Sequence, residues 1–148
     1  MTKETPVQWF DNRNFRSKTD ITSVAEVIPP GQMKQIRSFH RQIPAFRMSP
    51  LLNLSNLSYR LGLGGIWIKD ESSRLNQGSF KVLGGSYALY QLIKKRLGRE
   101  NEEISFEELT SKAVKEKIGE LVFATATDGN HGRGIAWSAS QLGFRSII

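Results

Sequence analysis

The chain of 148 residues has no cysteine and only two histidines, His40 and His131. A disulfide framework and a thiol nucleophile are therefore excluded, and two histidines are too few to suggest a metal cluster, so we predict no metal site. No apolar run approaches the ~20 residues of a membrane-spanning helix. Residues 1–4 lack the apolar core of a signal peptide. We therefore expect a cytoplasmic protein with no membrane partner.

Acidic residues are in the minority. The 14 Asp and Glu against 21 Lys and Arg give a formal net charge of +7. Such a surplus suits either a nucleic acid or an anionic cofactor. The basic residues are spread along the chain, and their densest group, residues 94–96, lies near the end of a predicted helix, where cations favour the helix dipole. We therefore expect no nucleic-acid partner.

The order of predicted elements indicates an α/β fold. Apolar spacing and turn residues predict a helix that starts near 29–31 and carries Met33, Ile36 and Phe39. They also predict helices over about 49–62, 81–98, 105–119 and 130–142, and strands over 66–69, 121–126 and from 146 onward. Residues 105–108 form a capping box that opens the fourth helix. Strands that alternate with helices favour a parallel sheet with flanking helices. Residues 1–28 are predicted to be an N-terminal arm.

Lys81 is the first candidate site residue. It follows Ser79-Phe80 and precedes an apolar stretch with Gly84-Gly85, so we place it in the first turn of a partly buried helix. The helix dipole and partial burial both disfavour an ammonium group there. A neutral lysine amine is a nucleophile that forms a Schiff base with a carbonyl cofactor.

A second candidate site is the turn at residues 125–134, between a strand and a helix. Its sequence, TATDGNHGRG, offers backbone N–H groups at a helix N-terminus, where anions bind. Its glycines allow a ligand or a neighbouring backbone to come close. We expect His131 to be a packing or turn residue, and the cap of this helix is a second reading of Asn130.

Together these segments resemble one family. The order KDE (69–71), GSFK (78–81) and TDGNH (127–131) resembles the fold type II pyridoxal-phosphate enzymes, which have a tryptophan synthase β-like architecture. Within them, FKVLGGSYA (80–88) and TDGNHGRGIAW (127–137) are most similar to the diaminopropionate ammonia-lyases. The likeness runs from about Gln35 to the last residue. The final strand has no helix after it, so we expect residues 29–148 to be the N-terminal part of a longer, truncated enzyme.

The resemblance implies a role for each matching residue. Lys81 would hold pyridoxal 5′-phosphate and then remove the Cα proton of an amino-acid substrate. Asn130 would hydrogen-bond the cofactor's ring hydroxyl, and Thr127 and Gly129 would hold the substrate carboxylate. Asp128 would be a second base, acting on the D-enantiomer. The implied reaction converts 2,3-diaminopropionate to pyruvate and ammonia, in a homodimer when full-length.

Three alternatives stay open from the sequence. One is a threonine or serine dehydratase, or a threonine synthase, against which Asp128 argues. Another is a non-catalytic remnant, because neither the glycine-rich phosphate loop of the resembled enzymes nor their residue near the pyridine nitrogen is found before Ile148. The third is a nucleotide-binding sheet, but the spacing of Gly129, Gly132 and Gly134 is not that of a dinucleotide fingerprint.

Overall fold

A computed structural model describes residues 28–127 and 129–148 of the chain. The predicted N-terminal arm, except Ile28, lies outside the described residues, as does Asp128. Among the residues described, no helix combines the length and the apolar composition needed to cross a membrane. The elements follow one another as α2 (Pro30–Gln42), β1 (Leu51–Asn53), α3 (Ser55–Arg60), β2 (Trp67–Lys69), the 3-10 turn η1 (Arg74–Asn76), α4 (Lys81–Leu97), α5 (Phe106–Thr110), α6 (Lys112–Ile118), β3 (Val122–Ala124), α7 (Asn130–Leu142) and β4 (Arg145–Ile147).

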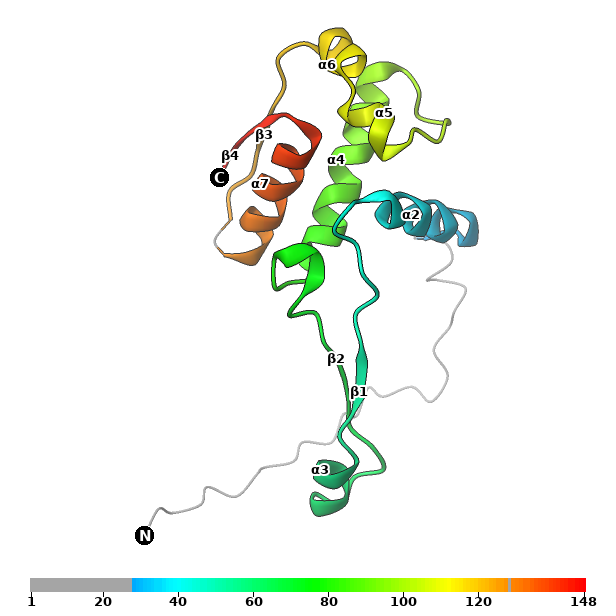
Figure 1. The fold of residues 1–148 in the computed structure, drawn as a ribbon, viewed down its shortest axis with the longest axis vertical. Helices are drawn as coiled ribbons and strands as arrows, with labels where there is room; N and C mark the ends of the chain where they lie inside the picture. The colour runs from blue at the N-terminus through cyan, green and yellow to red at the C-terminus, as the bar shows by residue number, and fades with distance from the viewer. Residues whose placement is uncertain (1–27, 128) are drawn as a thin grey trace, which may run out of the picture.

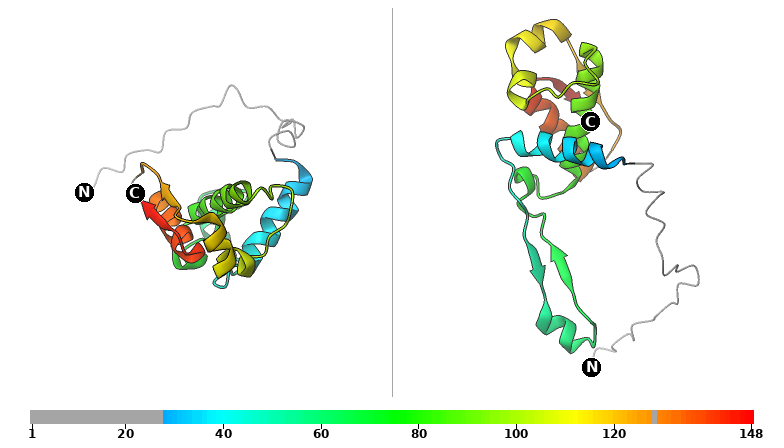
Figure 2. Two further views of the ribbon diagram at one scale, coloured as in Figure 1. Left: turned by 90° about the horizontal axis from the view of Figure 1, so that it is seen from above. Right: turned by 90° about the vertical axis from the view of Figure 1, so that its right-hand side faces the viewer.

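Helix α4 is the centre of the folded body, with α2 crossing it and α7 lying beside it (Figures 1 and 2). Its buried side chains include Val82, Leu89 and Ile93, which share one face of the helix. On the α2 side, the rings of Phe39 and Tyr90 stack with centroids 4.4 Å apart. The helix ends where the sequence predicts, at Gly98, whose φ of 69° suits a left-handed C-cap.

Strands β3 and β4 pair in parallel, joined through α7 as a strand–helix–strand unit. Val122 lies opposite Arg145, and Ala124 lies opposite Ile147. The prediction of parallel pairing on either side of the 130–142 helix is therefore confirmed. The strand predicted over 121–126 is shorter, at three residues.

The prediction that a helix begins at residue 49 is wrong. Residues 51–53 form β1, which pairs antiparallel with β2, and only the short α3 follows. The backbone explains this result, because Pro50 O accepts a hydrogen bond from Asp70 N at 3.0 Å and Leu54 N donates one to Ile66 O at 2.9 Å. The expected apolar face is not buried either, since Leu57 is 44% exposed and Leu61 is 59% exposed.

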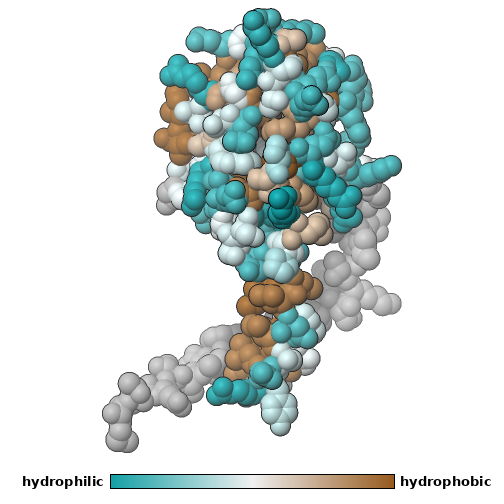
Figure 3. Space-filling view, in the orientation of Figure 1, coloured by the Kyte–Doolittle hydropathy of each residue, from teal (hydrophilic) through white to brown (hydrophobic). Residues whose placement is uncertain are grey.

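The unit β1–α3–β2, which we call the hairpin (residues 51–69), projects away from the folded body (Figures 1 and 2). All six residues of its two strands are exposed. Figure 3 shows apolar side chains gathered on the hairpin. They include Leu51, Leu52, Leu57, Leu61, Leu63, Trp67 and Ile68.

The single helix predicted over 105–119 is two helices, α5 and α6, separated at Ser111. Ser105 caps α5 as predicted, with Oγ accepting from Glu108 N at 3.1 Å. Ser111 caps α6 in the same way, accepting from Val114 N at 3.3 Å. The Glu108 carboxylate does not complete the capping box, because it pairs with Arg99 instead, at 2.5 Å.

Candidate active site

Lys81 is the first residue of α4, as predicted. Ser79 is buried, and its Oγ accepts a hydrogen bond from Lys81 N at 3.2 Å, which satisfies one of the N–H groups that a helix start leaves open. The neighbouring Val82 is fully buried, yet the Lys81 side chain is exposed. The expectation that Lys81 is partly buried is therefore wrong, because the face of α4 that packs begins one residue later.

The loop before Lys81 carries two consecutive residues with left-handed backbone, Leu75 (φ 47°) and Asn76 (φ 58°). This conformation is uncommon for a leucine and persists where packing enforces it. Leu75 is only 1% exposed, so its side chain is anchored in the core despite the strained backbone. The path of the chain into Lys81 is thus fixed by burial.

Arg74 holds this loop to the segment before β1, a link that the sequence alone does not predict. Its guanidinium donates to both carboxylate oxygens of Glu71, at 2.5 and 3.0 Å, to Ser49 Oγ at 2.7 Å and to Arg47 O at 2.6 Å. Ser49 Oγ donates in turn to Glu71 at 2.5 Å. The Arg74 guanidinium and the Ser49 hydroxyl hold the pKa of Glu71 at about 2. We call these three residues, Arg74, Glu71 and Ser49, the arginine network.

Only part of the arginine network has a local signal. Glu71 and Arg74 are three residues apart and oppositely charged, a spacing that favours an ion pair in a helical turn. Ser49 lies 25 residues before Arg74, so nothing near it in the sequence predicts the contact.

The N-terminus of α7 forms the other half of the site. Gly129 precedes the helix with φ 69° and ψ −134°, a backbone conformation open to glycine. Among the described residues, no side-chain hydrogen bond caps the helix at Gly129. Asn130 is exposed and is the first helical residue, so the N-cap position that it was a candidate for is held by Gly129. His131 is also exposed, which does not support the packing role expected for it.

Glycines bring the two helix starts together. A Cβ on Gly134 of α7 would lie 3.0 Å from Val82 Cα and 3.5 Å from the Lys81 carbonyl carbon. One step along, a Cβ on Gly85 would lie 3.0 Å from Ile135 Cδ1. The helices thus run side by side with both N-termini at the same end, as Figure 1 shows. The structure places Lys81 and Asn130 at this shared end, which we call the paired N-termini.

This packing also explains the glycine spacing that suggested a nucleotide loop. Gly134 allows α7 to approach α4, and a Cβ on Gly132 would meet Thr127 Cγ2 and the Ile148 side chain. Both glycines therefore serve contacts between elements of the chain itself. A phosphate loop would need them to face a ligand.

His40 is a further buried polar group near Lys81. Its Nε2 donates to Leu83 O, in the first turn of α4, at 2.9 Å. Burial and the nearby Arg74 lower the pKa of His40, so its neutral form is favoured. His40 thus ties α2 to the start of α4 without adding charge.

Comparison with known proteins identifies similar sequences over most of the chain. Residues 43–148 match the family described as "Pyridoxal-phosphate dependent enzyme". Diaminopropionate ammonia-lyase from Salmonella typhimurium is 48% identical over 136 residues, which is 91% of this chain and 34% of that protein. The Escherichia coli K12 protein of the same name is 42% identical over 139 residues, or 93% of this chain and 32% of that protein.

A solved structure also resembles the fold. The crystal structure of diaminopropionate ammonia lyase from Escherichia coli in complex with D-serine has a TM-score of 0.71 and 44% sequence identity, covering 80% of this chain and 29% of that one. The chain thus spans about a third of the length of the curated relatives it matches.

Proposed function

This chain belongs to the family of pyridoxal-phosphate dependent enzymes, and from that premise we propose that it supplies the lysine-bearing part of a lyase. The proposed reaction is the α,β-elimination of 2,3-diaminopropionate to pyruvate and ammonia. One structural observation carries the proposal, namely the paired N-termini, where an exposed lysine and an exposed asparagine begin two packed helices. The names of the similar proteins support the substrate.

The residues at the paired N-termini fit a pyridoxal-phosphate cofactor. Lys81 is exposed and forms no ion pair among the described residues, so its amine is open to a carbonyl group. The start of α7 offers N–H groups and a positive dipole end to an anion. When bound, the cofactor would stabilise negative charge at the substrate Cα and so allow the β-amino group to leave.

We assign a part in the proposed reaction to each residue of the candidate site. Lys81 Nζ would bind the cofactor covalently and later take the proton from the substrate Cα. The Asn130 amide would donate to the cofactor's ring oxygen without adding charge. Thr127 and the backbone at Gly129 would hold the substrate carboxylate. Asp128, outside the described residues, would act as the second base for the D-enantiomer.

The first experiment locates the cofactor on the chain. The purified 148-residue protein is mixed with pyridoxal phosphate, reduced with borohydride and mapped by peptide mass. We expect one dominant label, on Lys81, that is lost in Lys81→Ala and kept in Lys95→Ala, which removes an exposed lysine at the far end of α4. A label that persists in the Lys81→Ala protein would show that another lysine holds the cofactor.

The second experiment identifies the substrate in a protein that carries this chain at the full length of its relatives. Pyruvate release is measured from 2,3-diaminopropionate, serine and threonine side by side. Faster turnover of serine or threonine would favour a dehydratase instead. Asp128→Asn should impair D-substrate more than L-substrate, and equal losses would contradict the two-base assignment.

We also propose that the full-length protein is a cytoplasmic homodimer that acts on a small amino acid, with no nucleic-acid or membrane partner. Sedimentation of that protein tests the dimer, and cell fractionation tests the compartment. A monomer or a membrane-bound fraction would contradict this part of the proposal.

A further inference from the structure

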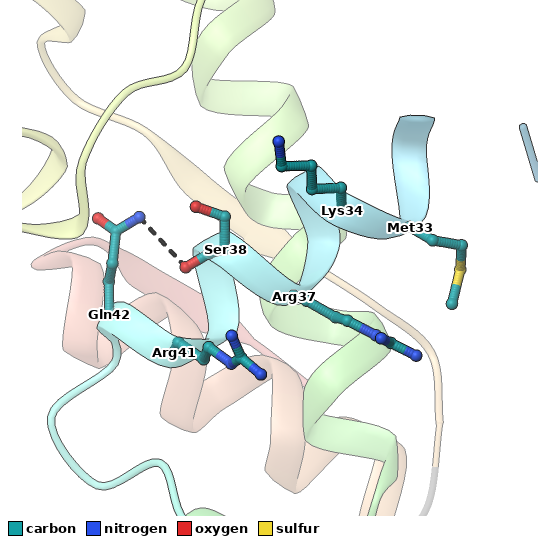
Figure 4. A pocket seen from close by; sticks show the side chains of 6 residues that line it. All are labelled: Met33, Lys34, Arg37, Ser38, Arg41 and Gln42. Carbon is teal, nitrogen blue, oxygen red and sulfur yellow. Dashed lines mark hydrogen bonds between the residues drawn. The ribbon is translucent and has the colours of Figure 1, made fainter. Parts of the chain in front are cut away.

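Helix α2 presents a basic face with no acidic residue on the same helix. Lys34, Arg37 and Arg41 are spaced by three and four residues, so they share one side of the helix. Figure 4 shows these three side chains with Met33, Ser38 and Gln42 around them. All three cations are exposed, and none forms an ion pair with a described residue.

Two of these cations also border a hollow between α2 and the start of α4. The hollow measures about 300 Å³ and is lined by Arg37, His40, Arg41, Phe46, Met48, Arg74 and Leu83. Arg74 is neutralised by Glu71 within the arginine network. Arg37 and Arg41 have no such partner among residues 28–127 and 129–148, so within that part of the chain the rim of the hollow keeps two unbalanced positive charges.

The apolar wall of the hollow is held in place by its neighbours. The Phe46 ring lies under the Arg74 guanidinium, 5.2 Å from its carbon to the ring centroid. The ring is also nearly parallel to that of His40, with an interplanar angle of 8° and centroids 6.5 Å apart. His40 is fixed in turn by its bond to Leu83 O. A ligand would therefore meet a preformed surface.

We propose that this hollow binds an organic anion in which a carboxylate or phosphate group is joined to an apolar body. The guanidinium groups of Arg37 and Arg41 match the paired oxygens of either anionic group. Phe46, Met48 and Leu83 offer apolar surface to the rest of the molecule, as ligand pockets commonly do. An extended polyanion would use only the outer basic face of α2 and leave this wall uncovered.

The site is separate from the turn before α7, yet it reaches the same catalytic helix. Leu83 lies two residues after Lys81 in the first turn of α4. The His40–Leu83 hydrogen bond joins the wall of the hollow to that turn. A ligand in the hollow would thus affect the position of the first turn of α4, although it does not occupy the proposed cofactor site.

The two histidines of the chain give a direct test by nuclear magnetic resonance of their rings. His40 reports on the hollow and His131 on the start of α7. The 148-residue protein is titrated with phenyl phosphate, benzoate and inorganic phosphate. We expect a saturable shift of the His40 signals with phenyl phosphate or benzoate, and a clearly weaker one with inorganic phosphate, which lacks the apolar body.

Two double variants distinguish specific binding in the hollow from non-specific electrostatic attraction of an anion to a basic protein. Arg37→Gln with Arg41→Gln should weaken binding at His40 at least roughly tenfold, because two charge-assisted contacts are removed. The control variant, Arg60→Gln with Arg96→Gln, removes the same charge from exposed positions outside the hollow. Binding measured at His40 should be unchanged in this control. The proposal is overturned if His40 does not shift, if both double variants lose binding equally, or if inorganic phosphate binds as well as phenyl phosphate.

The same spectra keep this proposal distinct from the proposed function. Changes at His131 follow anion binding at the α7 turn, and borohydride labelling of Lys81 follows the cofactor. If Lys81 is labelled but the His40 signals do not shift, only the proposal of a ligand site in the hollow is rejected. If the His40 signals shift but Lys81 is not labelled, only the proposed cofactor site is rejected.

Discussion

At the scale of single residues, Glu71 shows how charge is used to fix the approach to Lys81. Its pKa lies at about 2, below its ordinary 4.5, chiefly because Arg74 donates to the carboxylate. A carboxyl group with a lowered pKa stabilises the folded chain fully above pH 4.5, and this stabilisation is lost as the pH falls toward 2. The corresponding free energy is about 3 kcal/mol.

We predict that Glu71→Gln lowers the free energy of unfolding at pH 7 by about 3 kcal/mol, because it leaves the Arg74 guanidinium buried without a counter-charge. The difference from the unchanged protein should shrink between pH 4.5 and pH 2. Urea unfolding at several pH values measures both effects. Glu116→Gln is the control, since its pair with Lys112 spans 3.5 Å at an exposed site and should be worth less than about 1 kcal/mol. Equal losses in the two variants would contradict the arginine network.

At the scale of elements, the contact between α4 and α7 depends on glycine where the backbones meet. The nearest neighbours of a Cβ on Gly134 are backbone atoms of Val82, at 3.0 and 3.2 Å, which cannot rotate away. Adding that Cβ would push the two helices apart at the end that carries Lys81. The close approach of the two helices at the paired N-termini therefore requires a residue without a Cβ atom at position 134.

We predict that Gly134→Ala lowers the free energy of unfolding by about 1–3 kcal/mol through overpacking, and weakens cofactor labelling of Lys81. Gly84→Ala is the matched control in the facing helix, because a Cβ there meets nothing within 4 Å. That change should raise stability by up to about 1 kcal/mol, as alanine is the better helix former. Thermal unfolding compares the two. A destabilised Gly84→Ala beside an unaffected Gly134→Ala would reverse the assignment.

At the scale of the whole molecule, the described chain consists of a packed body and the projecting hairpin. A two-stranded sheet with both faces in solvent has little stability of its own. The apolar side chains it exposes are of the kind that promote association between chains. Body and hairpin should therefore respond differently to mutation.

We predict that Trp67→Thr in the hairpin changes the free energy of unfolding by no more than about 0.5 kcal/mol and reduces self-association in sedimentation velocity. Trp67 is 59% exposed, whereas Phe39 in the body is 2% exposed. Phe39→Ala should cost about 3–5 kcal/mol. Comparable destabilisation by both changes would mean that the hairpin is packed in solution.

The ends of the long helices were predictable because their signals are local. Gly98 and Gly143 end α4 and α7 in left-handed C-caps, with φ of 69° and 78°. Lys81 and Asn130 were both placed correctly as residues that begin helices. The break at Ser111 also had a local signal, a serine cap, but the apolar pattern on either side of it favoured one continuous helix.

What the sequence could not predict depends on distant partners. Leu54, Leu57 and Leu61 have the spacing of a buried helix face. However, β2 pairs with residues 51–53 just before them, only the short α3 follows, and Leu57 and Leu61 stay exposed. The contact of Ser49 with Arg74 crosses 25 residues. The prediction that Lys81 is partly buried is wrong because the face of α4 that packs begins at Val82, one residue after the start of the helix.

Because α4 and α7 are held together by their own close contact, the exposed turn that follows α4 is largely free to vary in length. This turn lies at the end of α4 opposite Lys81, and the chain then packs back on the body through α5 and α6, whose Leu109, Val114 and Ile118 are buried. Insertions in a surface connection cost little entropy as it lengthens. Natural variants and engineered fusions should therefore tolerate extra residues near Glu100 and Asn101, which are exposed. By contrast, one added methyl group at Gly134 should destabilise the fold.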